Sequence, residues 1–448
     1  VAEAAAVAAE ELHQAAPAQS APAWRNRHWF PVASALELDP DRATPLRIDG
    51  VDLLAQLEGA SKGSDGVWRV SHCGPDGSPR GLLPTAVYFQ IVWVWFGEEP
   101  PTVHPRDVME GTYLAEREVV FAYTRDLPYG YDSLLENLSD VSHIPWAHHG
   151  LQGTRDDAIP IAMTRPEVVY SEPGEEPVSL PVDGKGLLTF DFKDQSMKMY
   201  REASMFLRSP FFLYYTGTFE PPPGEQGSED YKQFAARRGI KDGEGKVPFL
   251  LNVFIIPVAP GWSRAIIVNT KDPDEDGGFI TKLPQFVAHL FSNRFLDSDL
   301  AFLHYQERWL RRGRPTTGSE WRQAYYIPGE CDRSVGAIRQ WLLQEGARCV
   351  LPGPGSDLPP SPPSRAELLD RYSQHTAHCV HCQRAWSASE MAQKAIAAVG
   401  AGAFALDRLD LGPAPLWLFL QVLAVGVVVS GEKLKEQMRF MDYEHYKT

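Results

Sequence analysis

The feature that most constrains the fold is a series of apolar runs separated by Gly and Pro. "TAVYFQIVWVWFG" (85–97) is continuously apolar and predicts a buried strand or a pair of strands. "RSPFFLYYTGTFEPPPG" (208–224) also predicts strands, and "KVPFLLNVFIIPVAPGWSRAIIVNT" (246–270) predicts a hairpin that turns at "PVAPGW". A long helical pattern follows at 283–313, as one helix or two. The sequence therefore describes a mixed chain of strands and helices.

Length and charge narrow the class of protein further. The 448 residues are 44% hydrophobic, enough for two or more packed domains. A net charge of −15 argues against nucleic acid as a partner, because binding it requires a basic surface. Five cysteines are too few for a disulfide scaffold. Residues 1–23 are rich in Ala and predict a disordered tail or the remainder of a cleaved targeting segment.

The last hundred residues carry a linker and two apolar segments. Residues 351–366 are rich in Pro and predict a stiff linker. Apolar segments occupy 395–406 and 415–430, whereas a full membrane crossing needs about 20 residues. Taken singly, each segment also fits a buried helix. Taken together, with the polar joint between them, they predict a transmembrane helical hairpin within 391–448.

The stretch "ENLSDVSHIPWAHHG" (136–150) is crowded with side chains that bind metals. Asn137, Asp140 and His143 recur every third residue, which predicts a stripe along one face of a helix. His148 follows His143 by five residues, about 140° around an unbroken helix. Pro145 disfavours helical geometry at the residue before it. We therefore expect the helix to end near His143 and the chain to turn back toward the same point.

Two imidazoles suit Fe, Zn, Cu or Ni, and two His with one carboxylate are typical of non-haem Fe(II) oxygenases. The carboxylate must then come from elsewhere in the chain. "FLDSDLAFLHYQE" (295–307) offers Asp297 and Asp299 on a predicted helix. The spacing of the histidines alone fits equally a pair of surface or core side chains.

"NLSDVSHIPWAHH" resembles the Asn-x-x-Asp-x-x-His-x4-His motif in the catalytic domain of Rieske-type oxygenases, and most closely the branch around pheophorbide a oxygenase. Four further stretches agree with that branch and follow in the same order. They are "WRNRHWFPVA" (24–33), "IIPVAPGWSR" (255–264), "LDSDLAFLHYQE" (296–307) and "HTAHCVHC" (375–382). The resemblance runs from about residue 24 to the end of the sequence.

This resemblance implies an α+β fold with a truncated Rieske-like β domain at 24–110. It also implies a helix-grip catalytic domain at 111–350, built from an antiparallel sheet plus helices. A helix with the Cys-x-x-Cys motif is expected at 367–390, before the membrane hairpin. The function implied is oxygenation of a chlorophyll-derived tetrapyrrole at a mononuclear non-haem Fe(II). The location implied is a chloroplast membrane, either the thylakoid or the inner envelope.

The iron ligands implied by the resemblance are His143, His148 and Asp299. Asp299 is preferred because it precedes Gln306 in the helix as the family's carboxylate precedes a Gln. Asp297 is the alternative carboxylate.

Two other residues of the motif have implied roles beside the iron. Asp140 resembles the acidic residue that links the iron site to the Rieske cluster of a neighbouring subunit, and it would hold the free N–H of an iron-bound His. Asn137 would lie beside the iron without being a firm ligand. His149 is expected to be a surface neighbour.

The family's [2Fe–2S] cluster is not supported by this sequence. Such a cluster needs two Cys and two His, and only Cys73 precedes residue 331. The segment between "GVWRV" (66–70) and "TAVYF" (85–89) fits neither half of the family's cluster motif, which implies that the cluster-binding loops are deleted, either by loss in the gene or by a skipped exon.

Without a cluster of its own, the chain needs electrons from outside. They would come from ferredoxin or from a cluster-bearing subunit of a homo- or hetero-oligomer. The alternatives are a catalytically silent protein that binds a pigment or a partner at a plastid membrane, and a mis-predicted transcript of an active oxygenase.

"HTAHCVHC" places Cys379 and Cys382 three residues apart. A redox pair that exchanges with thioredoxin is the preferred interpretation. A zinc site that uses both thiols and two of His375, His378 and His381 is the other.

Overall fold

The computed structural model describes residues 28–443 except 62–63, 171–185, 226, 239, 241–245, 275–279, 312–320 and 346–357. The predicted tail (1–23) and the first part of the predicted linker (351–357) lie outside the described residues. The expected α+β class with antiparallel sheets is confirmed.

Two small antiparallel sheets form the N-terminal part. One has the strand order β1-β7-β6 and the other β2-β3-β4-β5. The run 85–97 is a pair of strands, β6 and β7, with a turn at Phe89 and Gln90 where φ is positive. Every residue of β7 is buried. The strands are β1 (Trp29–Ser34), β2 (Thr44–Ile48), β3 (Val51–Ser61), β4 (Ser64–Cys73), β5 (Pro79–Leu83), β6 (Thr85–Tyr88) and β7 (Ile91–Trp95).

A single large antiparallel sheet forms the centre of the protein. Its strand order is β10-β11-β12-β13-β14-β15-β8, and β9 pairs with β11. The predicted hairpin at 246–270 is confirmed as β14 and β15, joined at Pro260 and Gly261. The strands are β8 (Glu118–Leu127), β9 (Ala162–Met163), β10 (Glu167–Val168), β11 (Leu188–Ser196), β12 (Met199–Ser209), β13 (Phe212–Glu220), β14 (Val247–Ala259) and β15 (Trp262–Lys271).

The small sheets pack against the end of the large one. The backbone N–H groups of Asp49 and Gly50 donate to the carbonyls of Pro257 and Val258, each at 2.8 Å. Side chains of both parts belong to one continuous apolar core. The N-terminal region is therefore joined to the large sheet by hydrogen bonds and by shared apolar packing.

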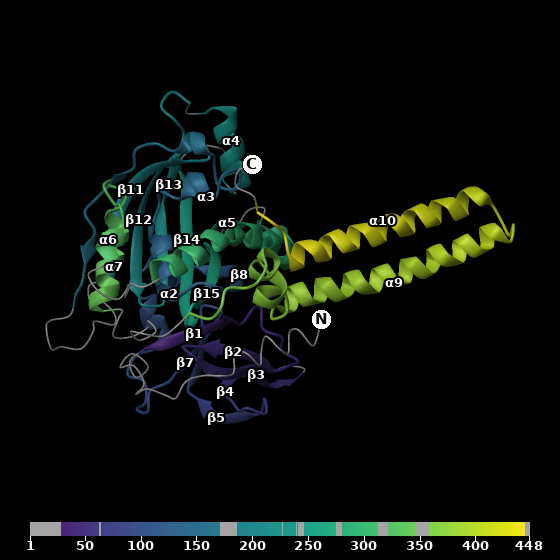
Figure 1. The fold of residues 1–448 in the computed structure, drawn as a ribbon, viewed down its shortest axis with the longest axis horizontal. Coiled ribbons are helices and arrows are strands. Elements are labelled where there is room, and N and C mark those ends of the chain that lie inside the picture. The colour runs from purple at the N-terminus through teal and green to yellow at the C-terminus, as the bar shows by residue number, and fades with distance from the viewer. Residues whose placement is uncertain are drawn as a thin grey trace.

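Helices surround the large sheet, and α5 (Gln285–Arg311) is the longest of those close to it. It is one continuous helix, and it packs beside β8 (Figure 1). The others in this region are α2 (Tyr131–Ser139), α3 (Ile144–Ala147), α4 (Glu229–Arg237), α6 (Trp321–Ala324) and α7 (Arg333–Gln344), with 3-10 turns η2 (Pro105–Val108), η3 (Tyr113–Glu116), η4 (Arg155–Asp157) and η5 (Ile280–Lys282).

The C-terminal segment is a helical hairpin that projects from the body (Figure 1). After α8 (Arg365–Leu368) and the π turn η7 (Tyr372–Thr376), α9 (Val380–Arg408) and α10 (Ala414–Arg439) run antiparallel and meet at a turn before Pro413. The expected Cys-x-x-Cys helix and the first apolar segment are parts of the same helix, α9.

Among the described helices, α10 alone is long and apolar enough to cross a membrane, with a mean hydropathy of 1.9. Its outward apolar side chains are exposed, among them Leu418, Phe419, Val422 and Val425. Of the two predicted membrane spans, only the second has a candidate helix among the described residues, because the first half of α9 is polar.

Candidate metal centre

The stretch 136–150 folds as two short helices separated by a turn. α2 ends one residue before Asp140, which has extended backbone angles (φ −85°, ψ 107°). The Asp140 carboxylate accepts hydrogen bonds from the backbone N–H and the hydroxyl of Ser142, at 2.8 and 2.6 Å, a local turn that competes with helix. The prediction that Asn137, Asp140 and His143 share one helix face is therefore wrong.

His143 and His148 lie at the two ends of α3, a single helical turn with Pro145 near its start. Proline is common at this position because the backbone N–H that it lacks would have no partner within the first turn. The turn brings the two Nε2 atoms to 3.3 Å from each other. The two histidines thus converge as predicted, but Pro145 lies in the first turn of the second helix and does not end the first.

Asp299 reaches the same point from α5. Its Oδ2 atom lies 3.4 Å from Nε2 of His148 and 3.9 Å from Nε2 of His143. Asp297 points elsewhere, because its carboxylate is 2.7 Å from Arg125 Nη2 and 2.7 Å from Arg371 Nε. Asp299, and not Asp297, therefore faces the histidines; we call His143, His148 and Asp299 the His-His-Asp group.

The outer nitrogens of both rings are held by hydrogen bonds. Nδ1 of His143 is 2.5 Å from the carbonyl oxygen of Asp140, which has no proton to give, so the ring donates. Nδ1 of His148 is 2.6 Å from Ser298 Oγ, whose hydroxyl donates to the carbonyl of Phe295. These bonds place the ring protons on Nδ1 and leave the Nε2 lone pairs directed inward.

The His-His-Asp group is buried on one side and open on the other. The side chains of Asp299 and His148 are 4% and 2% exposed, whereas that of His143 is 17% exposed. Burial raises the pKa of Asp299 to about 7, opposed by the neighbouring His143. Oδ1 of Asp299 is buried and has no hydrogen-bond partner among the described residues.

A buried carboxylate oxygen without a donor is costly unless a cation or a donor satisfies it. Here it accompanies two inward imidazole lone pairs. The donor set of two His and one carboxylate matches that of mononuclear non-haem iron. The residues therefore fit such a metal, with an accessible side at His143.

This chain is similar in sequence to several known proteins. Residues 209–316 match the family described as pheophorbide a oxygenase. The Arabidopsis thaliana protochlorophyllide-dependent translocon component 52 is 29% identical, over 74% of this chain and 62% of its own length. Pheophorbide a oxygenase of Oryza sativa subsp. japonica is 24% identical, over 94% of this chain and 85% of its own.

The resemblance to the pheophorbide a oxygenase branch is confirmed. Flavonoid 8-hydroxylase 2 of Ocimum basilicum is 26% identical over 77% of this chain and 70% of its own length. All three relatives are chloroplastic by name. Crystalline dicamba monooxygenase is 11% identical with a TM-score of 0.43, over 70% of this chain and 96% of its own. The chain spans 62% of the length of the Arabidopsis relative.

Within this pheophorbide a oxygenase-like chain, Asp140 lies beside the His-His-Asp group. The Asp140 carboxylate is 3.9 Å from Nδ1 of His143, whereas the Asp140 carbonyl is at 2.5 Å. The backbone of Asp140, and not its side chain, therefore holds the ring. Asn137 is buried in the last turn of α2. His149 is partly exposed, and its Nδ1 accepts a hydrogen bond from the backbone N–H of Arg155.

A buried charge network, which sequence analysis did not predict, joins α2 to α5 and α7. Glu136 forms an ion pair with Arg339 and accepts hydrogen bonds from Gln306 at 3.2 Å and Tyr325 at 2.8 Å. Arg339 also contacts Asp132 at 3.1 Å. Because Gln306 follows Asp299 along α5, this network holds α5 against α2, the helix that ends just before the turn to His143.

The N-terminal sheets do not offer a set of ligands for a Rieske cluster. Cys73 ends β4, and a tight turn closed by a 2.8 Å bond from Gly74 N–H to Ser78 leads directly into β5. His28 packs edge-on against a buried Phe, and His104 caps a 3-10 turn. Among the described residues before 111, no three His, Cys, Asp or Glu side chains converge on one point.

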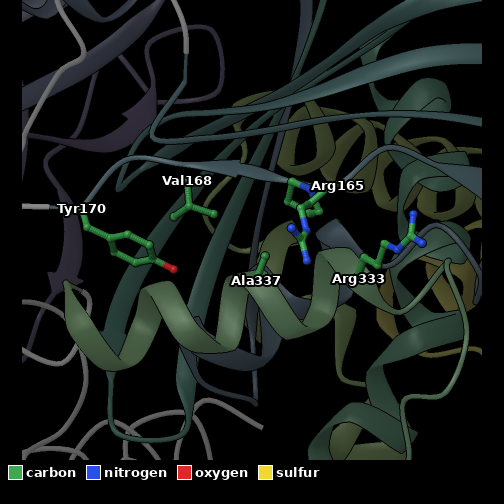
Figure 2. A pocket seen from close by; sticks show the side chains of 6 residues that line it. Arg165, Val168, Tyr170, Arg333 and Ala337 are labelled. Atoms are coloured by element: carbon green, nitrogen blue, oxygen red, sulfur yellow. The ribbon is translucent and has the colours of Figure 1, made fainter.

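The aromatic segment 204–219 belongs largely to the core, and it also positions α2. The hydroxyl of Tyr215 donates to the carbonyl of Leu138 at 2.6 Å. A surface hollow of about 470 Å³ lies elsewhere, between the strand segment 165–170 and α7 (Figure 2). Its lining includes Arg165, Tyr170 and Arg333 and none of the His-His-Asp group.

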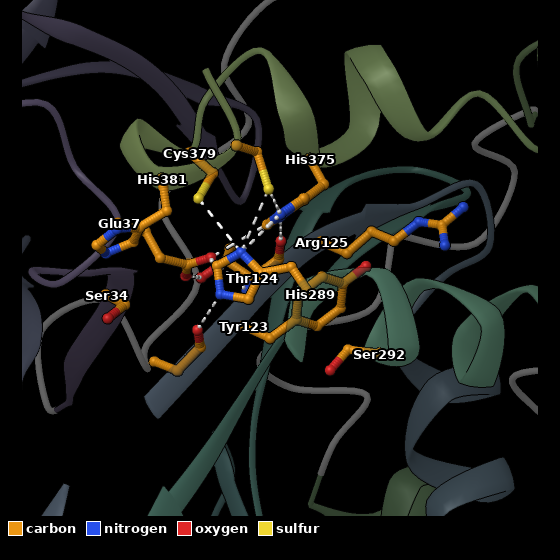
Figure 3. Close-up of polar contacts among 12 residues, drawn as sticks. Ser34, Glu37, Tyr123, Thr124, Arg125, His289, Ser292, His375, Cys379 and His381 are labelled. Carbon is orange, nitrogen blue, oxygen red and sulfur yellow. Dashed lines mark hydrogen bonds and ion pairs between the residues drawn. The ribbon is translucent and has the colours of Figure 1, made fainter. Parts of the chain in front are cut away.

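A second group of ligand-type side chains lies where α9 begins (Figure 3). Cys379 and Cys382 meet His375, as the zinc interpretation required, and also His289 from α5, which sequence reasoning missed. His378 is exposed, and the ring of His381 bonds instead to the carbonyl of Leu36 at 2.9 Å. No spacing rule could find His289, because it lies 86 residues before His375.

Proposed function

We propose that this chain oxygenates a chlorophyll-derived tetrapyrrole at a mononuclear non-haem iron, with electrons supplied from outside the chain. The observation that carries the proposal is the convergence of two imidazole Nε2 atoms and the buried carboxylate of Asp299. His143, His148 and Asp299 would hold the iron. Iron in such a site supplies the reductive activation of dioxygen that an oxygenase needs.

The chain's own residues have three roles in this proposal. The carbonyl of Asp140 and the hydroxyl of Ser298 keep the ring protons on the outer nitrogens, so both rings stay in the metal-binding tautomer. Phe295 stacks on His148 with ring centroids 3.9 Å apart and excludes water from that side. The more exposed side at His143 is left for substrate.

The described residues of this chain offer no means of delivering electrons to the iron. The N-terminal sheets hold no set of cluster ligands, so the electrons must pass through a cluster-bearing subunit, which ferredoxin would reduce. Asp140 is 26% exposed and lies next to His143, a position open to such a partner. The assembly would be a homo- or hetero-oligomer at a chloroplast membrane, with α10 as the candidate anchor.

The relatives' names support the substrate class without fixing the substrate. Two of them carry protochlorophyllide or pheophorbide a in their names, and one is a flavonoid hydroxylase. A test should therefore offer pheophorbide a, protochlorophyllide and a flavone side by side.

The test separates iron binding from turnover. The full chain is loaded with Fe(II) without air, and nitric oxide is added so that electron paramagnetic resonance detects a mononuclear iron adduct. We expect one iron per chain, lost in His143→Ala and His148→Ala and kept in His149→Ala. Turnover is then measured with ferredoxin and reductant, with and without a cluster-bearing homologue, and we expect product only when the homologue is present.

The absence of cluster ligands from the N-terminal sheets favours a second candidate, a silent protein that binds a pigment or a partner. It predicts pigment binding without product in every mixture. Iron bound equally by the wild type and His143→Ala would contradict the site itself. Sequencing the transcript across codons 66 to 90 decides whether a longer, cluster-bearing form exists.

A further inference from the structure

The four side chains at the start of α9 form a compact set, separate from the His-His-Asp group. They are His289, His375, Cys379 and Cys382, and we call them the Cys2His2 group. We propose that this group binds one Zn²⁺ ion, which fixes the C-terminal hairpin to the catalytic body. The inference is independent of the proposed oxygenase function.

The distances within the Cys2His2 group suit one tetrahedral ion. Nδ1 of His289 lies 3.4 Å from each sulfur, and Nε2 of His375 lies 3.3 Å from the sulfur of Cys382. The two ring nitrogens are 3.2 Å apart. Zn–S bonds of about 2.3 Å and Zn–N bonds of about 2.0 Å place tetrahedral ligands about 3.3 to 3.8 Å from one another.

The protons of both rings are directed away from the centre of the group. The outer nitrogen of His289, Nε2, is 3.0 Å from the carbonyl oxygen of Ala122, and the outer nitrogen of His375, Nδ1, is 2.6 Å from that of Thr124. Because a carbonyl only accepts, each ring donates outward and turns a lone pair inward. Both carbonyls belong to β8, so the sheet itself sets the tautomers, as in other metal sites where outer hydrogen bonds orient the ligands.

The burial and the charge of the Cys2His2 group are typical of a structural zinc site. All four residues are at most 2% exposed, which leaves no open position for a substrate and is typical of structural zinc. Two thiols release two protons as Zn²⁺ binds two thiolates, so the bound group has no net charge. Glu37 lies 3.8 Å from Nδ1 of His375, a carboxylate near the outer edge of the ring (Figure 3).

Two other assignments of the Cys2His2 group are less consistent with the geometry. In a Rieske cluster the cysteines bind one iron and the histidines the other, so a two-iron, two-sulfide core separates them. Here sulfur and nitrogen are in direct contact, and the core would not fit. A redox disulfide would use Cys379 and Cys382 but gives no reason for two oriented histidines beside them.

The position of the group gives zinc a mechanical role. His289 belongs to α5, His375 to η7, and the two cysteines to the first turn of α9 and the residue before it. One ion would therefore join the catalytic helix to the base of the projecting hairpin. Sites of this kind contribute directly to folding free energy.

The test uses the full chain, freed of metal under reducing conditions and titrated with Co²⁺ and then Zn²⁺. Tetrahedral Co²⁺ with two thiolates gives strong visible bands and a sulfur-to-cobalt band in the near ultraviolet. We expect one equivalent of Co²⁺ with this signature, displaced by Zn²⁺. Cys379→Ser, Cys382→Ser and His289→Gln should each weaken zinc binding at least tenfold, measured by competition with a chromophoric chelator.

Three controls keep the outcome clear. Cys331→Ser removes a thiol outside the group, and His381→Asn removes a neighbouring ring outside it, so both should bind zinc as the wild type does. His143→Ala should keep the sulfur-to-cobalt band, which separates this site from the iron proposal. If ligand variants fail to fold, the wild-type cobalt spectrum decides alone. A spectrum without the sulfur band, or unchanged zinc affinity in Cys382→Ser, would overturn the proposal.

Discussion

Asp297 and Asp299 lie two residues apart on α5, yet replacing each by Asn should have opposite consequences. Asp297 forms ion pairs with Arg125 and Arg371, whereas Asp299 faces His143 and His148. Asn has nearly the same size and shape as Asp, so each replacement tests the charge with little change in packing. We expect Asp297→Asn to lower the stability without abolishing iron binding. We expect Asp299→Asn to weaken iron binding without lowering the stability.

The magnitude for Asp297 follows from its surroundings. The side chains of Asp297 and Arg125 are fully buried, and that of Arg371 is 2% exposed. Removing one partner of a buried ion pair costs about 3–5 kcal/mol, because the other charge is left uncompensated. Arg125 keeps Gln374 as an acceptor at 2.8 Å, and Arg371 keeps the carbonyl of Gln437. These remaining bonds place the cost near 3 kcal/mol, a large share of a typical 5–15 kcal/mol of stability.

Asp299→Asn should leave the metal-free protein at least as stable as the wild type. No Arg or Lys is paired with Asp299 among the described ion pairs, and burial disfavours its charged form. The neutral amide removes that penalty but is a poor ligand for iron. Losing outer hydrogen bonds to a metal site costs roughly 10 to 100-fold in affinity, so losing a ligand should cost at least as much.

The assay has two arms, both on the full chain. Urea unfolding of metal-free protein, followed by circular dichroism, gives the free energy of unfolding. Competition with a chromophoric chelator under nitrogen gives the iron affinity. The reasoning is refuted if Asp297→Asn unfolds at the wild-type urea concentration, or if Asp299→Asn binds iron as tightly as the wild type.

Three further predictions concern the rest of the chain. Burial and a neighbouring carboxylate raise the pKa of Glu307 to about 7. The stability that Glu307 contributes is therefore full below about pH 4.5 and is lost as the pH rises through 7. In urea unfolding, Glu307→Gln should reduce the slope of the unfolding free energy against pH by up to about 1.4 kcal/mol per pH unit. A Cβ at Gly130 would lie 2.7 Å from Oε1 of Glu307, so Gly130→Ala should cost roughly 1–3 kcal/mol of unfolding free energy, while Gly336→Ala, with nothing nearer than 3.7 Å, should not. Replacing both Leu418 and Val425 by Asn should reduce co-sedimentation with lipid vesicles, and unchanged binding would show that another surface attaches the protein.

The strands and the two histidines were predictable because each depends on local sequence. β14 and β15 follow from apolar runs around "APG", and the convergence of His143 and His148 was predicted, although Pro145 lies in the first turn of α3 and does not end the preceding helix. The end of α2 was mispredicted because the Asp140 side chain forms a local turn with Ser142, which competes with the helix and leaves no mark in the three-residue spacing.

The remaining site residues were hidden because their partners are distant in sequence. The local pattern "FLDSDL" does not separate Asp297 from Asp299; the family resemblance favoured Asp299, and the ion pairs of Asp297 with Arg125 and with Arg371, 74 residues away, give the physical reason. His289 joins two cysteines that lie 90 and 93 residues later. Such pairs are set by how α5 packs against β8 and η7, which is information that no local window contains.

The helix α5 supplies a ligand to both groups, His289 to one and Asp299 to the other. Ten residues of helix separate them, about 15 Å along the axis, and the Asp297 ion pairs lie between. The two donor sets differ in kind. Two sulfurs and two nitrogens in a closed, buried site suit zinc, whereas two nitrogens and one carboxylate with an accessible side suit iron. Ligand type and exposure, more than affinity alone, would therefore keep the two metals apart along one helix, with one ion holding the hairpin and the other available for chemistry.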